Sequence, residues 1–246
     1  MNTRSANSKD YVLIHGAWHG AWCWEKVTPL LVEAGHVVHT LDLPGLGDDE
    51  TAIADVSLDA YVLEVMRLIN AIGSPVVLVG HSMGGMVITQ VAEKIPDKIH
   101  TLIYLTAFSP MNGEALLQYA LEDTDSYVAQ YKQINEEEGY FTVAEDKLQE
   151  CFYHKCSDED AANAIRRLRP QALAPVATPL VLSDENYGTV RRCYIECTED
   201  RAISHSMQKR LRDNAPVDKS LVLETDHSPF YSCPEALTDA LLELSS

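Results

Sequence analysis

The stretch VVLVGHSMGGMVITQVA, residues 76–92, decides the fold of this chain. Residues 76–79 form an apolar run rich in β-branched residues, typical of a strand that is buried on both faces. From residue 85 the pattern indicates a helix that ends before Pro96. Residues 80–84 between them read GHSMG and match the pattern G-x-S-x-G, in which a sharp strand-to-helix turn exposes a serine hydroxyl.

The residue types in this turn agree with nucleophilic chemistry at Ser82. A sharp turn holds the serine in strained backbone geometry, and a Cβ at Gly80 or Gly84 would collide with neighbouring backbone. The following helix directs free N–H groups and its positive end toward the turn, where they stabilise negative charge on a substrate oxygen. We therefore predict Ser82 as a nucleophile; the alternative is a tight turn with an incidental serine.

Strand-like and helix-like segments alternate on both sides of this turn. The predicted strands cover residues 11–15, 36–43, 75–81, 100–107, 191–198 and 219–225. The predicted helices cover residues 27–34, 58–72, 85–95 and 234–244. This order predicts an α/β fold with a mainly parallel sheet and helices on both of its faces.

One long segment interrupts the alternation. Residues 109–190 are acidic, rich in tyrosine and helical in pattern, without a convincing buried strand. Structureless loops of that length are uncommon inside a domain, so we predict a helical cap inserted over the carboxyl edge of the sheet. The core would then consist of residues 1–108 and 191–246, the whole forming one structural domain.

Ser82 requires a base, and in this architecture the order along the chain is nucleophile, acid, histidine. Six of the nine histidines precede the turn, lie within it or open the next strand, and His154 lies in the predicted cap. His205 falls in a predicted helix, where a surface role is the ordinary explanation. His227 follows the last predicted strand in a loop, and we predict it as the base.

The acid is expected directly after the strand before last. Glu199 and Asp200 both lie there, and Asp200 is the shorter side chain and further into the turn. Asp226 adjoins His227, but neighbouring side chains on an extended loop point apart, which favours a local hydrogen-bonding role. We therefore predict Asp200 as the acid.

Acyl transfer also needs two N–H donors for the forming oxyanion. One is expected from Met83, the residue after the nucleophile, and the other from the loop after the first strand, HGAWHGAW, residues 15–22. The spacing of His15 and His19 also suits a zinc site on a helix, but glycines interrupt any helix there and no third ligand lies nearby. We expect neither a metal nor an organic cofactor.

Composition excludes several partner classes. The chain has 19 basic and 37 acidic residues and a formal charge of −18, which opposes binding to nucleic acid or anionic lipid. No apolar run reaches the roughly 18 residues of a membrane span, and the first ten residues contain no signal-like apolar region. We expect a cytoplasmic protein that meets neither nucleic acid nor membrane.

Several segments resemble the α/β-hydrolase superfamily, in particular the branch of small plant-type methyl esterases and hydroxynitrile lyases with its bacterial esterase relatives. The resemblance rests on VLIHGAWHGAWCWEK, LDLPGLG, GHSMGG, YIECTED and the late DH pair. It covers most of the chain but the cap only loosely. It implies the triad Ser82, Asp200 and His227, an oxyanion hole formed by the N–H groups of Ala17 and Met83, and a homodimer.

Two positions distinguish the branches. The lyases have a threonine after the first histidine of the early loop and a lysine after the catalytic histidine, whereas this chain has Gly16 and Ser228. The resemblance therefore implies a serine carboxylesterase rather than a lyase. A ligand receptor with slow or no turnover, and an acyltransferase or C–C bond hydrolase with the same triad, stay open as alternatives.

The predicted substrate is a small, uncharged, largely apolar or aromatic ester, with methyl esters and hydrophobic xenobiotic esters included. No cation in reach suggests an anionic substrate. The predicted pocket lies between the turn and the cap. Its expected wall residues are Gly16, Ala17, Leu105, Phe108 and Ile203, of which the last three could equally be ordinary core.

Overall fold

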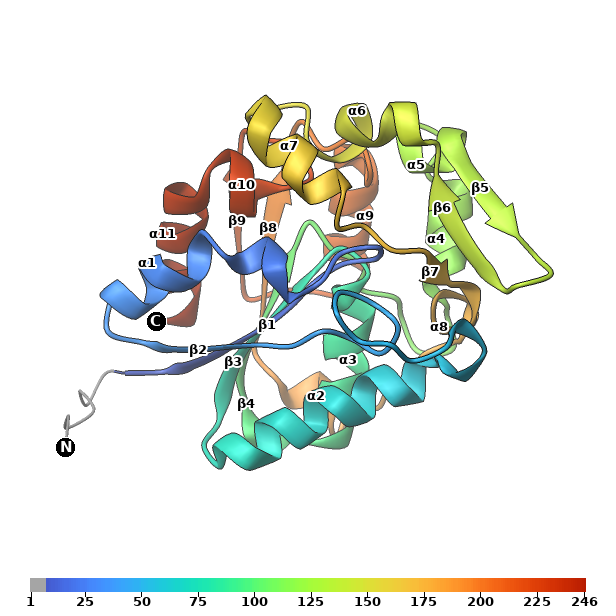
Figure 1. Cartoon of the computed structure of the whole chain (residues 1–246). Coiled ribbons are helices and arrows are strands. Elements are labelled where there is room, and N and C mark those ends of the chain that lie inside the picture. The colour runs from blue at the N-terminus through green and yellow to red at the C-terminus, as the bar shows by residue number, and fades with distance from the viewer. Residues whose placement is uncertain (1–7) are drawn as a thin grey trace.

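A computed structural model describes residues 8–246; the first seven residues of the predicted core segment lie outside this range. Its centre is a six-stranded, wholly parallel sheet in the order β2-β1-β3-β4-β8-β9 (Figure 1). The strands are β1 (Asp10–Ile14), β2 (Val37–Thr40), β3 (Val76–His81), β4 (Ile99–Leu105), β8 (Arg192–Cys197) and β9 (Lys219–Leu223). Each predicted strand is present, most of them a few residues shorter.

Helices cover both faces of this sheet, as the sequence predicts. Helices α1 and α11 lie side by side on one face, and α2 and α3 lie on the other (Figure 1). The bounds are α1 (Val27–Glu33), α2 (Leu58–Ile72), α3 (Gly84–Lys94), α9 (His205–Asn214), α10 (Pro229–Ser232) and α11 (Pro234–Ser245). None of the helices within residues 8–246 has the length and apolar content needed to cross a membrane.

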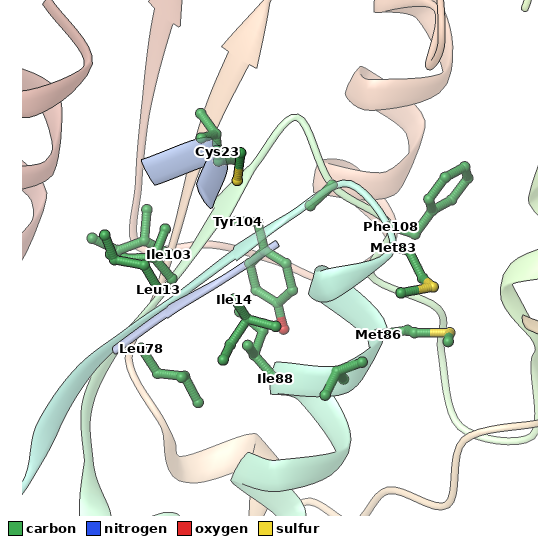
Figure 2. Close-up of a cluster of buried hydrophobic side chains, with 14 of the residues drawn as sticks. Leu13, Ile14, Cys23, Leu78, Met83, Met86, Ile88, Ile103, Tyr104 and Phe108 are labelled. Atoms are coloured by element: carbon green, nitrogen blue, oxygen red, sulfur yellow. The ribbon is translucent and has the colours of Figure 1, made fainter. Parts of the chain in front are cut away.

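The core lies between β3, its neighbouring strands and α3. Every residue of β1 and β3 is buried, because both strands have a neighbour on each side and helices on each face. Leu78 of β3 and Ile103 of β4 belong to one apolar cluster with Met86 and Ile88 of α3 (Figure 2). This packing fixes the strand-to-helix turn at residues 82–83, since both elements that flank it are buried.

Residues 109–190, named the cap segment from here on, connect β4 to β8. Its helices are α4 (Leu116–Glu122), α5 (Tyr127–Tyr131), α6 (Leu148–Phe152), α7 (Asp158–Ile165) and α8 (Leu173–Ala177). It also contains a small antiparallel sheet of β5 (Lys132–Asn135), β6 (Tyr140–Val143) and β7 (Gln171–Ala172). The prediction of a helical insertion is therefore incomplete. The small sheet was not predicted because its strands are short and mostly half-exposed, so that they contain no buried apolar run.

Candidate active site

Ser82 lies at the turn between β3 and α3, at the carboxyl edge of the sheet. Its φ is +54°, a left-handed conformation that is strained for a serine. The neighbouring backbone explains the glycines on either side. A Cβ on Gly80 would lie 2.7 Å from the Gly84 carbonyl oxygen, and one on Gly84 would lie 2.8 Å from that of His15. Only glycine fits where these main chains approach so closely.

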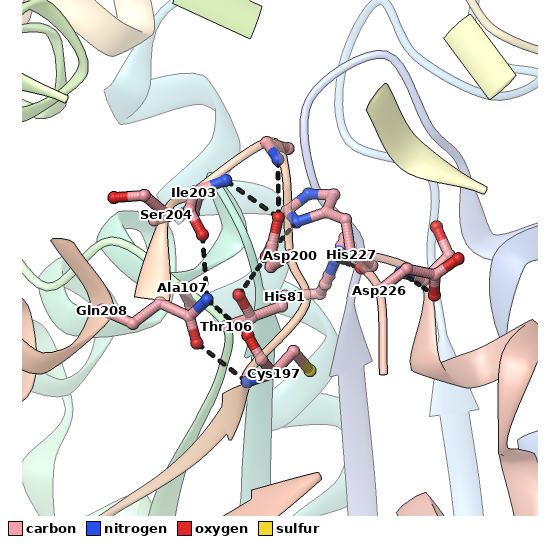
Figure 3. Close-up of polar contacts among 12 residues, drawn as sticks. His81, Thr106, Ala107, Cys197, Asp200, Ile203, Ser204, Gln208, Asp226 and His227 are labelled. Atoms are coloured by element: carbon pink, nitrogen blue, oxygen red, sulfur yellow. Dashed lines mark hydrogen bonds and ion pairs between the residues drawn. The ribbon is translucent and has the colours of Figure 1, made fainter. Parts of the chain in front are cut away.

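His227 and Asp200 meet at the same edge of the sheet. His227 follows β9, Asp200 follows β8, and His227 Nδ1–H donates to Asp200 Oδ2 at 2.7 Å (Figure 3). Their side chains are 1% and 0% exposed. Because Nδ1 carries the proton donated to Asp200, Nε2 is the ring nitrogen that can accept a proton from another group.

Asp200 is held by donors from three directions. Its Oδ1 accepts the N–H groups of Ala202 (2.6 Å) and Ile203 (2.9 Å), and its Oδ2 accepts the Thr106 hydroxyl as well as His227 (Figure 3). These donors hold the Asp200 carboxylate in one orientation toward His227. Thr106 has φ +37° at the end of β4, so a second strained residue faces the same carboxylate.

The Ser82 hydroxyl and the His227 ring border one cavity, but no direct hydrogen bond joins them in this structure. Such contacts are often long in the absence of substrate and shorten in the reacting complex. His81, directly before Ser82, links the turn to the loop of His227 instead. Its Nε2–H donates to the His227 carbonyl at 2.8 Å, and burial together with His227 holds the pKa of His81 well below its usual range.

Ala17 and Met83 border the same cavity as Ser82. Within residues 8–246, neither of their N–H groups donates a hydrogen bond. Buried amide groups are nearly always paired, so two free ones beside a serine hydroxyl are available for a ligand oxygen. The loop that carries Ala17 lies close against the turn: a Cβ on Gly16 would be only 2.8 Å from Ser82 Cβ.

The two histidines of HGAWHGAW both bind backbone rather than converge on a common point. His15 Nδ1–H donates to the Gly16 carbonyl (2.8 Å) and its Nε2 accepts the Leu43 N–H (3.0 Å). His19 Nδ1–H donates to the Ala17 carbonyl (2.7 Å). Burial lowers the pKa of His15 to about 4 and that of His19 to about 3, so both rings are neutral.

The cavity has a volume of about 290 Å³ and lies between the sheet edge and the cap segment. Its lining is largely apolar: Ala17, Trp18, Met83, Phe108, Leu116, Leu117, Ala120, Leu121, Val128, Ala129, Ile134, Phe141, Leu173, Val176, Ala202 and Ile203. The polar lining residues are Ser82, Asp123, Ser126, Lys132, Glu136 and His227.

Three predicted wall residues, Ala17, Phe108 and Ile203, thus border the cavity, and two do not. Leu105 ends β4 with its side chain fully buried in the core, and Gly16 lies behind Ser82 without a side chain to present. The prediction that no cation is in reach is wrong for Lys132. That residue lies on β5, an element the sequence did not reveal.

The rejected candidates have other partners. His205 begins α9 and its Nε2 lies 2.7 Å from Glu196, away from Ser82. Glu199 forms a surface ion pair with Lys155. Asp226 accepts the Ser228 N–H, the local bonding role that the sequence indicates, and also the N–H of Lys155 in the cap segment.

Sequence reasoning missed Thr106 and all the cap residues of the cavity. Thr106 had a usable signal, because a hydroxyl directly after a buried strand lies at the same edge as Ser82. The cap residues had none, since an apolar residue on a short helix faces the core or a cavity according to tertiary packing alone.

The chain has known relatives. A family model described as "Alpha/beta hydrolase family" matches residues 11–240, and the chain belongs to this family. It is 35% identical to salicylic acid-binding protein 2 of Nicotiana tabacum over 96% of this chain and 97% of that protein. It is 37% identical to the putative chloroplastic methylesterase 11 of Arabidopsis thaliana over 96% of this chain, but spans only 63% of that protein.

A solved structure of polyneuridine aldehyde esterase superposes on this fold with a TM-score of 0.90. It is 29% identical in sequence, and the match covers 98% of this chain and 100% of that one. The similarity therefore extends over the cap segment as well as the sheet.

Proposed function

We propose that this protein is a serine carboxylesterase in which Ser82, His227 and Asp200 form the catalytic triad. The observation that carries the proposal is the meeting of four groups around one cavity: the strained serine, the histidine bound to a buried carboxylate, and two free N–H groups. The family relatives named as methylesterases and as an esterase support the same reaction class.

In this mechanism the Ser82 oxygen attacks the ester carbonyl carbon while His227 Nε2 takes the hydroxyl proton. The carbonyl oxygen becomes an oxyanion that the N–H groups of Ala17 and Met83 stabilise. His227 then gives its proton to the leaving alcohol. A water molecule, activated by the same ring, attacks the acyl-enzyme and releases the carboxylic acid.

The substrate that fits best is a small, uncharged ester with an apolar or aromatic acyl or alcohol part, such as a methyl ester. The cavity volume of about 290 Å³ lies at the lower end of ligand pockets, which span about 300–1,000 Å³. Ala17, Phe108 and Ile203 would supply apolar walls on the sheet side. Lys132 on β5 and Glu136 directly after this strand add one charge of each sign to the lining of the cavity.

Cyanohydrin cleavage is less well supported. The lyase pattern needs a threonine where this chain has Gly16, and even a Cβ there would lie 2.8 Å from Ser82 Cβ and 2.9 Å from His81 Nδ1. The lysine of that pattern is replaced by Ser228, which is fully buried. Neither position offers a group that could hold a cyanide.

A receptor function is the second candidate, because one relative is named for binding salicylic acid. Burst-phase kinetics with a panel of esters separates the two functions: steady turnover indicates an enzyme, and a single stoichiometric event indicates a sensor. Added alcohol acceptors in the same assay reveal acyl transfer through a new ester product. The homodimer, the cytoplasmic location and the separate role of the cap segment stay predictions.

Ser82→Ala tests the proposal directly. Hydrolysis of p-nitrophenyl acetate and of larger aryl esters should fall by about 10⁴-fold or more, as removal of a triad member does. Ser245→Ala is a matched control, because Ser245 is also buried but bonds to Tyr11 far from the cavity. A Ser82→Ala protein with wild-type turnover would exclude the mechanism.

A further inference from the structure

His19 belongs to the loop of residues 15–22, named the Ala17 loop from here on, contacts the cap segment and is 1% exposed. Its Nδ1 bonds to the Ala17 carbonyl, and its Nε2 lies 2.7 Å from the hydroxyl of Tyr153, which follows α6. A carbonyl can only accept, so the single proton of the neutral ring is on Nδ1. Tyr153 must therefore donate to Nε2, and its hydroxyl anchors the ring that donates to the Ala17 carbonyl.

The Ala17 loop is a segment that needs such support. Trp18, directly after Ala17, has φ +63°, which is strained for a residue with a large side chain. Strained residues persist only where surrounding contacts hold them. Besides the His19 bond to Ala17, the Trp18 carbonyl accepts the Arg169 N–H at 2.9 Å and the Trp18 indole donates to the Phe141 carbonyl at 3.0 Å.

Three residues of the cap segment, Phe141, Tyr153 and Arg169, thus meet the loop at adjacent points. Of these three hydrogen bonds, only the one from Tyr153 joins two side chains, and Tyr153 is fully buried. Through His19, this contact reaches Ala17, which borders the cavity and whose N–H donates no hydrogen bond within residues 8–246. The orientation of that N–H depends on the backbone angles that the loop contacts hold.

We propose that Tyr153 is a positioning residue for the oxyanion donor: through His19, it holds the Ala17 backbone so that the Ala17 N–H points at the reacting oxygen. The inference rests on the proposed esterase mechanism, since it concerns the second donor of that oxyanion hole. It gives the cap segment a part in the chemical step and not only in substrate binding.

Tyr153→Phe removes one hydroxyl and keeps the ring. We expect kcat to fall about tenfold with little change in KM, less than the loss of a whole oxyanion donor, because the N–H is displaced and not deleted. The affinity for a trifluoromethyl ketone, compared with that for the matching methyl ketone, distinguishes positioning of the oxyanion donor from a merely structural role. Ser82 adds to the carbonyl carbon of the trifluoromethyl ketone, the serine proton passes to His227, and the carbonyl oxygen becomes an oxyanion.

The affinity for this ketone should fall by about the same tenfold, whereas the affinity for the matching methyl ketone, which stays uncharged, should not change. Tyr104→Phe is the matched control, because it deletes an equally buried hydroxyl that bonds to Thr89 and Tyr187 instead. This control should lower stability without changing the ratio of the two affinities.

His19→Asn tests the same link from the other side and should also lower kcat. Adding Tyr153→Phe to His19→Asn should cause no further loss, since two residues that act in series are not additive. Equal loss of both ketone affinities in Tyr153→Phe, or no loss of either, overturns the inference. If Ser82→Ala abolishes turnover while Tyr153→Phe keeps wild-type kcat, only this inference fails; if Ser82→Ala stays active, the proposed function fails.

Discussion

The strand-to-helix turn and the cap segment border the same cavity, but different contacts hold them in place. The turn packs backbone against backbone, with glycines at positions where a Cβ would lie within 3 Å of a carbonyl oxygen. The cap segment reaches the active-site loops mainly through polar side chains. Examples are Tyr153 to His19, the Asp226 carboxylate to the Lys155 N–H, and the Asp123 carboxylate to the Ser204 N–H.

This difference makes the strand-to-helix turn rigid and the cap segment more adaptable. A backbone-packed turn tolerates no side-chain variation, so the nucleophile and its neighbouring donor are held almost independently of the cap. Contacts through side chains can be lost one at a time, each with a graded effect. Substitutions in the turn should therefore produce large losses, and substitutions at the cap contacts should produce smaller and separable ones.

The largest effect is expected on the sheet side of the site. Asp200→Asn should lower kcat by about 10⁴-fold with little loss of stability, because His227 loses the acceptor that sets its tautomer. Steady-state kinetics with an aryl ester measures this. Glu199→Gln is the control, as Glu199 pairs with Lys155 at the surface and should keep wild-type activity. An active Asp200→Asn protein together with an inactive Glu199→Gln protein would identify Glu199 as the acid.

Gly85→Ala tests whether the turn is as tightly packed as the geometry indicates. Alanine favours a helix over glycine by about 1 kcal/mol. The new Cβ would however lie 2.3 Å from the Phe108 carbonyl oxygen, so we expect a net loss of about 2–3 kcal/mol in the free energy of unfolding. Gly188→Ala has its nearest contact at 3.4 Å and should be neutral. Urea denaturation of both variants decides; a stabilised Gly85→Ala protein would contradict the packing argument.

Asp226→Ala tests the contact between the cap segment and the loop of His227. Asp226 is fully buried and accepts the Lys155 N–H at 2.9 Å and the Ser232 hydroxyl at 2.8 Å. Losing it leaves buried donors unpaired, so we expect about 2 kcal/mol less stability and faster exchange of the Lys155 amide hydrogen. Unchanged exchange at Lys155 would show that other contacts suffice to hold the cap there.

The smallest effect is expected at Asp123, which borders the cavity and is 4% exposed. Burial raises the pKa of this carboxyl above its ordinary value of 3.8. A native pKa above the unfolded one means that the native state binds the proton more tightly. The free energy of unfolding therefore falls as pH rises from the ordinary pKa of 3.8 through the native pKa of Asp123.

Asp123→Asn removes this dependence and can still accept the Ser204 N–H. Relative to the wild type, its Tm should be about 2 °C higher at pH 7 and little changed at pH 4. Asp125→Asn, at an exposed neighbouring position, removes only the smallest of the causes that raise the pKa of Asp123, so it should show a much smaller difference between the two pH values. A Tm difference that is the same at both pH values would contradict a buried, titrating Asp123.

Much of the sheet and its loops could be predicted from short sequence patterns. The strand before Ser82, the glycines around it and the loop after β9 are local features, so periodicity and turn chemistry locate Ser82, Asp200 and His227 at one edge. The prediction that Leu105 lines the pocket was wrong, because a leucine at a strand end can face either the core or a cavity. The prediction of a purely helical cap was incomplete, because β5 and β6 are too short and too exposed to show a buried pattern.

The sequence by itself therefore determined the parallel α/β core, the serine turn and the order of its three predicted catalytic residues. Only the tertiary structure decided what the cap segment contributes: which of its side chains line the cavity, and how Tyr153 meets His19 from 134 positions away. The physical reason is the range of the interactions. Backbone turns and buried strands follow from neighbouring residues, whereas a hydrogen bond between distant side chains exists only once both segments are packed.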